Sequence, residues 1–243
     1  MNRTLKTIGA IFGAAGLLAG LLLCNFYVSF GYGGWTGFFA ELRSLPGEEK
    51  LAALRSEAID ELTQAQVELG SVPGLTLSEK TFSDMCAKGE HSWKRSESYA
   101  YVCAYRLTYY YGLTRDYKEI LLDLEQTLGN LGWSIGEQTP RQPTISEALR
   151  EYSGEIFLVE LPYYRKPVST GRALVLALNG FYGNSSYWTK SSSEPDPFGF
   201  GIGIGQKIYK NASSQSPQTI FQRIIAAGQE AIMIAISKEY FRN

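Results

Sequence analysis

The pattern of hydrophobic and polar positions divides the chain into two unequal parts. Residues 7–40 carry no charged side chain, and residues 7–30 are almost wholly apolar or small. A run of this length exceeds the roughly 20 residues that a helix needs to cross the hydrocarbon core of a bilayer. We therefore expect a short N-terminal segment over residues 1–6 and a transmembrane helix over residues 7–30.

A cleaved signal peptide is the alternative explanation of this run. The apolar part of a signal peptide normally spans about 7–15 residues and ends at a small-x-small site. Here the run is longer and leads into aromatic side chains, which favour the headgroup layer of a membrane. These are Tyr27, Phe30, Tyr32, Trp35, Phe38 and Phe39. We therefore expect a retained anchor.

Charge on the two sides of the run predicts its orientation. Arg3 and Lys6 precede it, and the first cation after it is Arg43. Lysine and arginine close to a membrane span stay on the cytoplasmic side. We therefore expect a cytoplasmic N-terminus, with the C-terminal domain outside the cytoplasm.

Four glycines in the expected span lie on one helix face, at spacings of 4, 3 and 4. They are Gly9, Gly13, Gly16 and Gly20. Small residues let membrane helices approach closely, so this face is a candidate for helix packing, either between two copies or within a larger membrane complex. Glycine is also common in membrane spans, which is the simpler explanation.

After the anchor, apolar side chains recur at spacings of three and four over residues 47–69, which predicts an amphipathic helix. The apolar stripe is Leu51, Leu54, Ala58, Leu62, Ala65 and Leu69. Arg55, Asp60, Glu61, Gln64 and Glu68 are expected elsewhere around the helix. Residues 31–74 therefore form the aromatic exit followed by this helix, which is either a free stalk or packed on the body.

Residues 75–243 alternate between strand and helix patterns. Helices are expected over residues 113–131 and from Pro217 to Gly228. Strands are expected over residues 99–111, 133–137, 156–161, 173–178, 198–209 and 231–241. Turn residues between the third and fourth strands predict an antiparallel hairpin. Together these elements predict an α+β domain, a two-layer sandwich with a mainly antiparallel sheet and two or three helices.

The three cysteines divide between the anchor and the body. Cys24 lies in the expected span, which leaves Cys86 and Cys103 in the part expected outside the cytoplasm. Disulfides persist in oxidising compartments, so we predict a Cys86–Cys103 disulfide. Zinc bound by Cys86, His91 and Cys103 is the alternative. Their spacing matches no common zinc finger, and we expect neither a metal nor a cofactor.

Catalytic signals are weak throughout the chain. His91 is the single histidine, and no G-x-S-x-G motif marks a nucleophile. Paired carboxylates for glycoside cleavage have no distinguishing spacing; the candidates are Glu155, Glu160, Glu194 and Asp196. We expect no catalytic residue. An envelope-polymer hydrolase that uses carboxylates or His91 remains the alternative.

Charge and aromatic content bear on the partners. The chain has 23 basic and 24 acidic side chains, so it lacks the basic excess typical of nucleic-acid binding. Aromatic residues make up 13% of the chain, and tyrosine and tryptophan suit recognition of proteins and sugar rings. The polar aromatic segment over residues 181–188 offers Tyr182, Tyr187 and Trp188 as binding residues. Alternatively, these rings cover a sheet edge.

We therefore expect a single-pass membrane protein that presents a non-catalytic domain outside the cytoplasm. Its role would be to bind an envelope component, a protein or a glycan. The remaining alternative is an accessory subunit of a membrane complex, in which the glycine face of the anchor packs against other helices.

Overall fold

A computed structural model describes residues 3–32, 34–89, 99–135, 144–151, 160–168, 173–181, 207–213, 215 and 217–243, with side chains of the first helix from Gly16 onward. The helices are α1 (Arg3–Tyr32), α2 (Trp35–Glu41), α3 (Glu48–Leu69), α4 (Tyr117–Asn130), α5 (Ile145–Glu151) and α6 (Pro217–Ala226). The strands are β1 (Leu75–Lys88), β2 (Tyr101–Leu113), β3 (Ser134–Ile135), β4 (Glu160–Lys166), β5 (Leu174–Phe181), β6 (Lys207–Ala212) and β7 (Glu230–Arg242).

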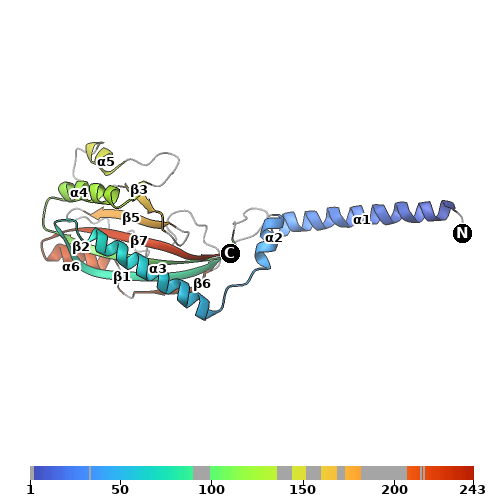
Figure 1. Ribbon diagram of the computed structural model, residues 1–243, viewed down its shortest axis with the longest axis horizontal. Helices are drawn as coiled ribbons and strands as arrows, with labels where there is room; N and C mark the ends of the chain where they lie inside the picture. The colour runs from blue at the N-terminus through green and yellow to red at the C-terminus, as the bar shows by residue number, and fades with distance from the viewer. Residues whose placement is uncertain are drawn as a thin grey trace.

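The described strands form one sheet in the order β3-β4-β5-β7-β2-β1-β6, and every pairing is antiparallel. The long strands β1, β2 and β7 form its centre, and the shorter strands flank them (Figure 1). This confirms the α+β class and the antiparallel sheet. Strand β4 pairs with β5 in an antiparallel hairpin, but β4 begins at Glu160, and residues 156–159 of the first expected strand lie outside the described residues.

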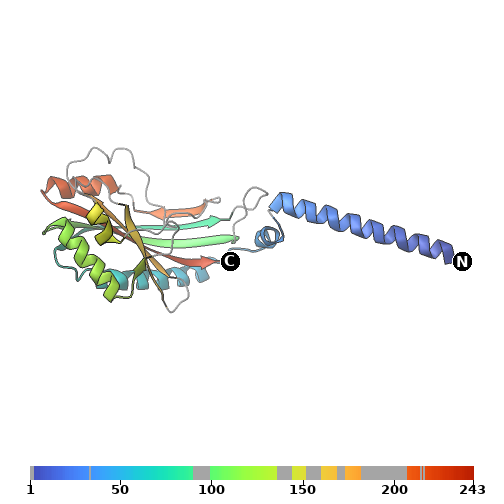
Figure 2. The ribbon, with the colours of Figure 1, turned by 90° about the horizontal axis from the view of Figure 1, so that it is seen from above.

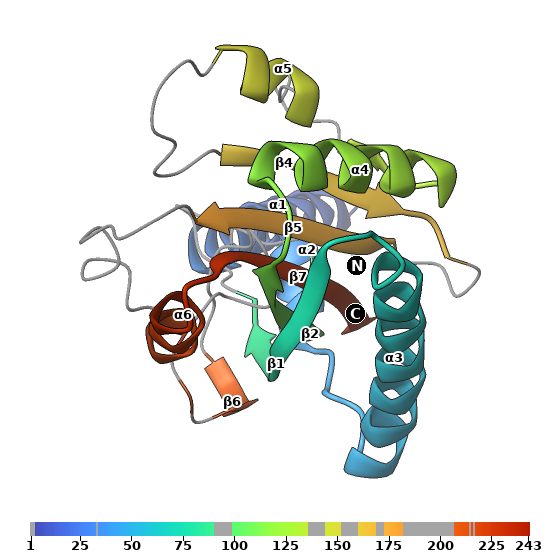
Figure 3. The ribbon, with the colours of Figure 1, turned by 90° about the vertical axis from the view of Figure 1, so that its left-hand side faces the viewer.

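Helices cover both faces of the sheet, so the expected two-layer arrangement is wrong. On one face α3 and α4 pack on Tyr109 of β2 and Ile234 of β7. On the other face α6 packs on Tyr110 and Met233, the next residues along the same two strands (Figure 3). Adjacent strand residues point to opposite faces, and both are apolar here, so each face needs a cover.

The helix expected over residues 47–69 is α3, and it packs on the body rather than standing free as a stalk. Glu48 and Glu49 lie in its first turn, where acidic side chains favour the positive end of the helix dipole. The buried part of its stripe consists of Leu51, Ala58, Leu62, Ala65 and Leu69. Figure 3 shows α3 lying along one side of the sheet.

The helix expected over residues 113–131 is α4, which begins at a side-chain cap. Asp116 accepts hydrogen bonds from the backbone N–H groups of Lys118 and Glu119, at 2.9 and 3.3 Å, and thereby satisfies donors that the first turn leaves free. Gly132, just after the end of the helix, has φ +79°, a conformation that favours glycine.

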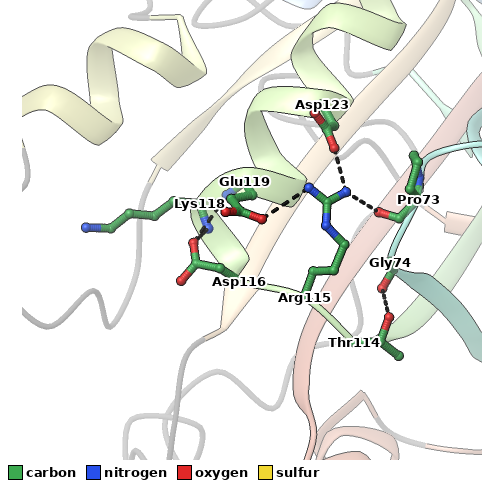
Figure 4. A network of polar contacts seen from close by, with 8 residues as sticks. All are labelled: Pro73, Gly74, Thr114, Arg115, Asp116, Lys118, Glu119 and Asp123. Atoms are coloured by element: carbon green, nitrogen blue, oxygen red, sulfur yellow. Dashed lines mark hydrogen bonds and ion pairs between the residues drawn. The ribbon is translucent and has the colours of Figure 1, made fainter.

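A surface network joins the start of α4 to the turn before β1 (Figure 4). Arg115 contacts Asp123 at 2.8 Å, Glu119 at 3.1 Å and the Pro73 carbonyl at 3.4 Å. The Thr114 N–H donates to the Gly74 carbonyl at 3.0 Å. Ion pairs at an exposed site contribute little to stability individually, so this network mainly fixes the geometry of the turn.

Other expected elements are found with shifted ends. The strands expected over residues 99–111, 133–137 and 231–241 are β2, β3 and β7, and the helix from Pro217 is α6. Only the end of the glycine-rich segment, from Lys207 onward, is described, as β6; residues 198–206 lie outside the described residues. Strand β1 and helices α2 and α5 were not expected.

Helix α1 leads away from the sheet, and α2 turns at its end (Figures 1 and 2). Among the helices, as far as their residues are described, none combines the length and the apolar composition that crossing a membrane requires. Within the span expected over residues 7–30, the side chains of residues 7–15 lie outside the described part of the structure.

Adjacent leucines of α4 offer a matched test of the core. Leu121 is fully buried, whereas Leu122 is 45% exposed. Leu121→Ala is expected to lower the free energy of unfolding by about 2–5 kcal/mol, because it leaves a cavity. Leu122→Ala is expected to change it by about 0.5 kcal/mol or less. Urea titrations of the full chain, followed by circular dichroism, measure both; equal losses would contradict this packing.

Candidate functional site

Three charged residues of α3 reach the sheet beneath it. Arg55 pairs with Asp84 of β1, Glu61 with Lys238 of β7, and Glu68 with Lys166 of β4. These three residues lie outside the buried stripe, as expected, but they border it closely enough to reach the sheet. Their spacing along the helix places one ion pair over each of three strands.

Asp84 is the buried centre of the first of these clusters. Its side chain is 4% exposed, and its Oδ2 lies 2.7 Å from Arg55 Nε. Its Oδ1 accepts a hydrogen bond from the Tyr240 hydroxyl at 2.9 Å. The Arg55 guanidinium also lies 6.0 Å from the centre of the Tyr240 ring. A buried carboxylate needs such partners, because desolvation of an unpaired charge costs several kcal/mol.

The predicted disulfide lies beside this cluster. Cys86 and Cys103 occupy directly opposed positions of β1 and β2 and form a disulfide with a Cα–Cα distance of 4.1 Å. That separation is close to the roughly 4.5 Å of non-hydrogen-bonded antiparallel pairs. The Tyr240 hydroxyl lies 3.7 Å from Cys86 Sγ. Both sulfur atoms are used in the disulfide, so the alternative zinc site at Cys86, His91 and Cys103 is wrong.

Tyr105 adds a phenol to the same face of the sheet. Burial raises its pKa, the nearby Asp84 carboxylate raises it further, and Arg55 opposes this shift. The phenol therefore stays protonated at neutral pH. Across the strands it is the register partner of Asp84 on one side and Lys238 on the other.

The cluster links helix α3 to the sheet. Its carboxylate contacts the guanidinium and accepts a hydrogen bond from the hydroxyl, and the two cysteines are paired in the disulfide. Within the described ranges, no three His, Cys, Asp or Glu side chains gather in a way that would hold a metal ion. The arrangement fixes α3 on the sheet at the Asp84 end.

The predicted binding residues Tyr182, Tyr187 and Trp188 lie outside the described residues. The same holds for His91 and for the acidic candidates Glu155, Glu194 and Asp196. Glu160 begins β4, and its side chain is not described. These assignments therefore stay predictions.

The glycine face of α1 is described in part. An added Cβ at Gly16 or Gly20 would meet no atom within 4 Å, so both positions face open space. The side chains at positions 9 and 13 are outside the described part of the helix. Packing through this face stays a prediction.

The Asp84 cluster was not anticipated from the sequence. One signal was available, because Arg55 follows Leu51 by four residues and precedes Ala58 by three, positions that share a helix face. A charged residue at such a position needs a partner. The sequence does not say which of the chain's 24 acidic residues supplies it.

Comparison with known proteins adds no relationship: no protein-family model, no curated protein and no solved structure matches this chain.

Removal of the Asp84 charge tests whether this cluster stabilises the folded domain. Asp84→Asn is expected to lower the free energy of unfolding by about 1.5–3 kcal/mol, the range for hydrogen bonds to charged groups. Glu48 also pairs with Arg55 but is 74% exposed, so Glu48→Gln is the matched control, with an expected change of about 0.5 kcal/mol or less. Chemical denaturation measures the free energy of unfolding of both variants. Similar losses in the two variants would contradict a stabilising role of the buried Arg55–Asp84 pair.

Alkaline pH is expected to unfold the domain. Burial raises the pKa of five tyrosines, which are Tyr105, Tyr109, Tyr111, Tyr117 and Tyr164. Above about pH 10 the unfolded chain loses these protons while the folded chain keeps them, so stability falls as pH rises. Phenolate absorbance at 295 nm should therefore appear together with loss of ellipticity. Ionisation of all tyrosines in the folded protein would contradict the burial.

Proposed function

We propose that the chain is a single-pass membrane protein that holds an α+β binding domain outside the cytoplasm. The observation that carries this proposal is the exposed apolar surface of α1. Five leucines of α1 are between 63% and 72% exposed; they are Leu17, Leu18, Leu21, Leu22 and Leu23. A large contiguous apolar surface on a protein marks contact with a membrane or a partner.

The sequence of α1 favours the membrane. Leu21, Leu22 and Leu23 are consecutive, so their side chains point in different directions around the helix, and all three are exposed. A helix that is apolar all round fits surroundings that are apolar all round. A single protein partner would cover one side only. The absence of charge over residues 7–40 agrees with this environment.

The disulfide supports the side assigned to the body. Cys86–Cys103 joins two central strands, and stable disulfides are rare in the cytosol and common in exported domains. The preceding cations Arg3 and Lys6 indicate the same orientation. The two arguments are independent, because one concerns redox chemistry and the other charge.

The role proposed for the domain is binding, without catalysis, of an envelope component, a protein or a glycan. The Asp84 carboxylate is buried and engaged by Arg55 and Tyr240 inside the domain. The segment over residues 181–188 follows β5, and its Tyr182, Tyr187 and Trp188 are the proposed contact residues. Aromatic side chains with polar tips are enriched at such contacts.

Reporter fusions test the topology. Alkaline phosphatase fused through a flexible linker after Asn243 is expected to be active, and green fluorescent protein at the same place is expected to be dark. Fusions after Lys6, before the apolar run, are the matched control and should behave in the opposite way. A fluorescent, phosphatase-negative fusion after Asn243 would contradict the proposed side.

Substitution of the aromatic segment tests binding. Tyr187→Ala combined with Trp188→Ala is expected to abolish capture of cross-linked partners from detergent-solubilised membranes, without a change in Tm. Val67 and Leu77 are exposed apolar residues elsewhere on the body, at 68% and 46%. The double variant Val67→Ala with Leu77→Ala is therefore the control. Undiminished capture by the aromatic variant would refute the assignment.

A further inference from the structure

Helices α1 and α2 meet in an aromatic elbow, which we define as residues 25–39. Gly34 forms the turn with φ +112°, a conformation that side chains rarely adopt. The Gly34 N–H donates to the Val28 carbonyl at 3.2 Å. Val28 is 2% exposed although its neighbours along α1 are not buried. The elbow is thus held by backbone geometry and by local packing.

Side chains hold the elbow closed. The Trp35 indole N–H donates to Asn25 Oδ1 at 3.1 Å, ten residues back along the chain. The ring centre of Phe38 lies 5.4 Å from that of Tyr32 and 5.8 Å from that of Trp35, in edge-to-face geometry. Such ring pairs contribute about 0.5–1.5 kcal/mol each beyond the area that they bury.

The elbow turns α2 across the axis of α1 rather than along it, and the two views agree on this (Figures 1 and 2). A helix that crosses a bilayer along its normal would therefore carry α2 parallel to the membrane plane. Trp35 and Phe39 of α2 remain 45% and 55% exposed. Their rings are free to contact lipid.

Length places α2 at the membrane surface. The hydrocarbon core, about 30 Å thick, takes about 20 helical residues at 1.5 Å each. Counted from Thr7, it ends close to Asn25 and Phe26. The last six residues of α1 rise about 9 Å beyond that point, more than the roughly 5–7 Å of the headgroup layer on each side. The Trp35–Asn25 hydrogen bond nevertheless returns the Trp35 ring to the depth of Asn25, at the inner edge of that layer. Tryptophan and tyrosine favour that layer.

We infer that α2 lies in the headgroup layer of the phospholipid bilayer, with Trp35 and Phe39 against lipid, and that the Trp35–Asn25 hydrogen bond sets its depth. The inference rests on the proposed membrane anchorage. Lipid is the occupant that fits, because α2 continues the apolar surface of α1, lacks charge until Glu41 and presents ring systems with a polar tip. The bond also satisfies the Asn25 amide, which is costly to leave unpaired next to hydrocarbon.

Fluorescence quenching by brominated phosphatidylcholine tests this placement. The full chain is reconstituted into vesicles whose lipids carry bromine at acyl carbons 6 and 7, or at 11 and 12. The chain has four tryptophans, so the contribution of Trp35 is the difference between the wild type and Trp35→Phe. Shallow bromines are expected to quench Trp35 more than deep ones. Trp35→Phe is expected to lose this quenching, and the control Trp133→Phe, at a position buried in the body, is expected to keep it.

The outcomes separate this inference from the proposal beneath it. If the chain does not float with vesicles in a density gradient, the membrane proposal fails. If it floats but wild type and Trp35→Phe are quenched equally, α2 is covered by protein or lies in water, and only the placement of α2 fails. Stronger quenching by the deep bromines would also overturn that placement.

The role of the hydrogen bond has its own test. Asn25→Leu removes the acceptor and is expected to reduce the ratio of shallow to deep quenching. Leu22→Ile, at a neighbouring exposed position of α1, is the control and should leave the ratio unchanged. An unchanged ratio in Asn25→Leu would overturn the positioning role of the bond.

Discussion

The packing of helix α3 on the sheet connects the N-terminal apolar segment to the α+β body. Leu51, Leu62 and Leu69 are buried in that contact, and each contributes roughly 1.5–3 kcal/mol. Of the three ion pairs beside them, Glu68–Lys166 is partly exposed, and such a pair contributes about 1 kcal/mol or less. Asp84 and Lys238 are buried, so for their pairs the cost of desolvation offsets most of the attraction, although removal of one partner is destabilising. Apolar burial therefore supplies the strength of the contact, and the ion pairs fix the position of the helix along the strands.

The restraints of the body concentrate at the end of the sheet where the anchor enters. The Cys86–Cys103 disulfide, the Asp84–Tyr240 hydrogen bond and the Arg55–Asp84 pair all lie there. At the same end the Asn243 side chain donates to the Ser44 carbonyl at 3.1 Å, which joins the last strand to the segment before α3. These contacts hold α3 firmly on the body, and they join the C-terminus to the segment that follows the proposed anchor.

Sequence reasoning succeeded where a single period dominates. The apolar stripe predicted α3, and isoleucine at every second position over residues 232–236 predicted β7. The oxidising compartment expected for the body predicted the disulfide. It missed β1 because residues 83–87 are buried on both faces while residues 76–78 are exposed, so no alternation is visible. It missed α5 although Thr144 and Glu147 form a capping box, with reciprocal hydrogen bonds of 3.0 and 2.8 Å.

The two-layer arrangement was wrong because the apolar side chains Tyr110 and Met233 require a helix on the second face of the sheet. The Asp84 cluster depends on contacts between distant segments, which spacing along the chain does not encode.

Hydrogen–deuterium exchange of the full chain in nanodiscs tests whether α3 is an integral part of the body. Amides of α3 between Ala58 and Leu69 are expected to exchange as slowly as those of β2 and β7, because all of them open together with the domain. Fast exchange in α3, beside full protection of β2 and β7, would show a loosely attached stalk and contradict this packing.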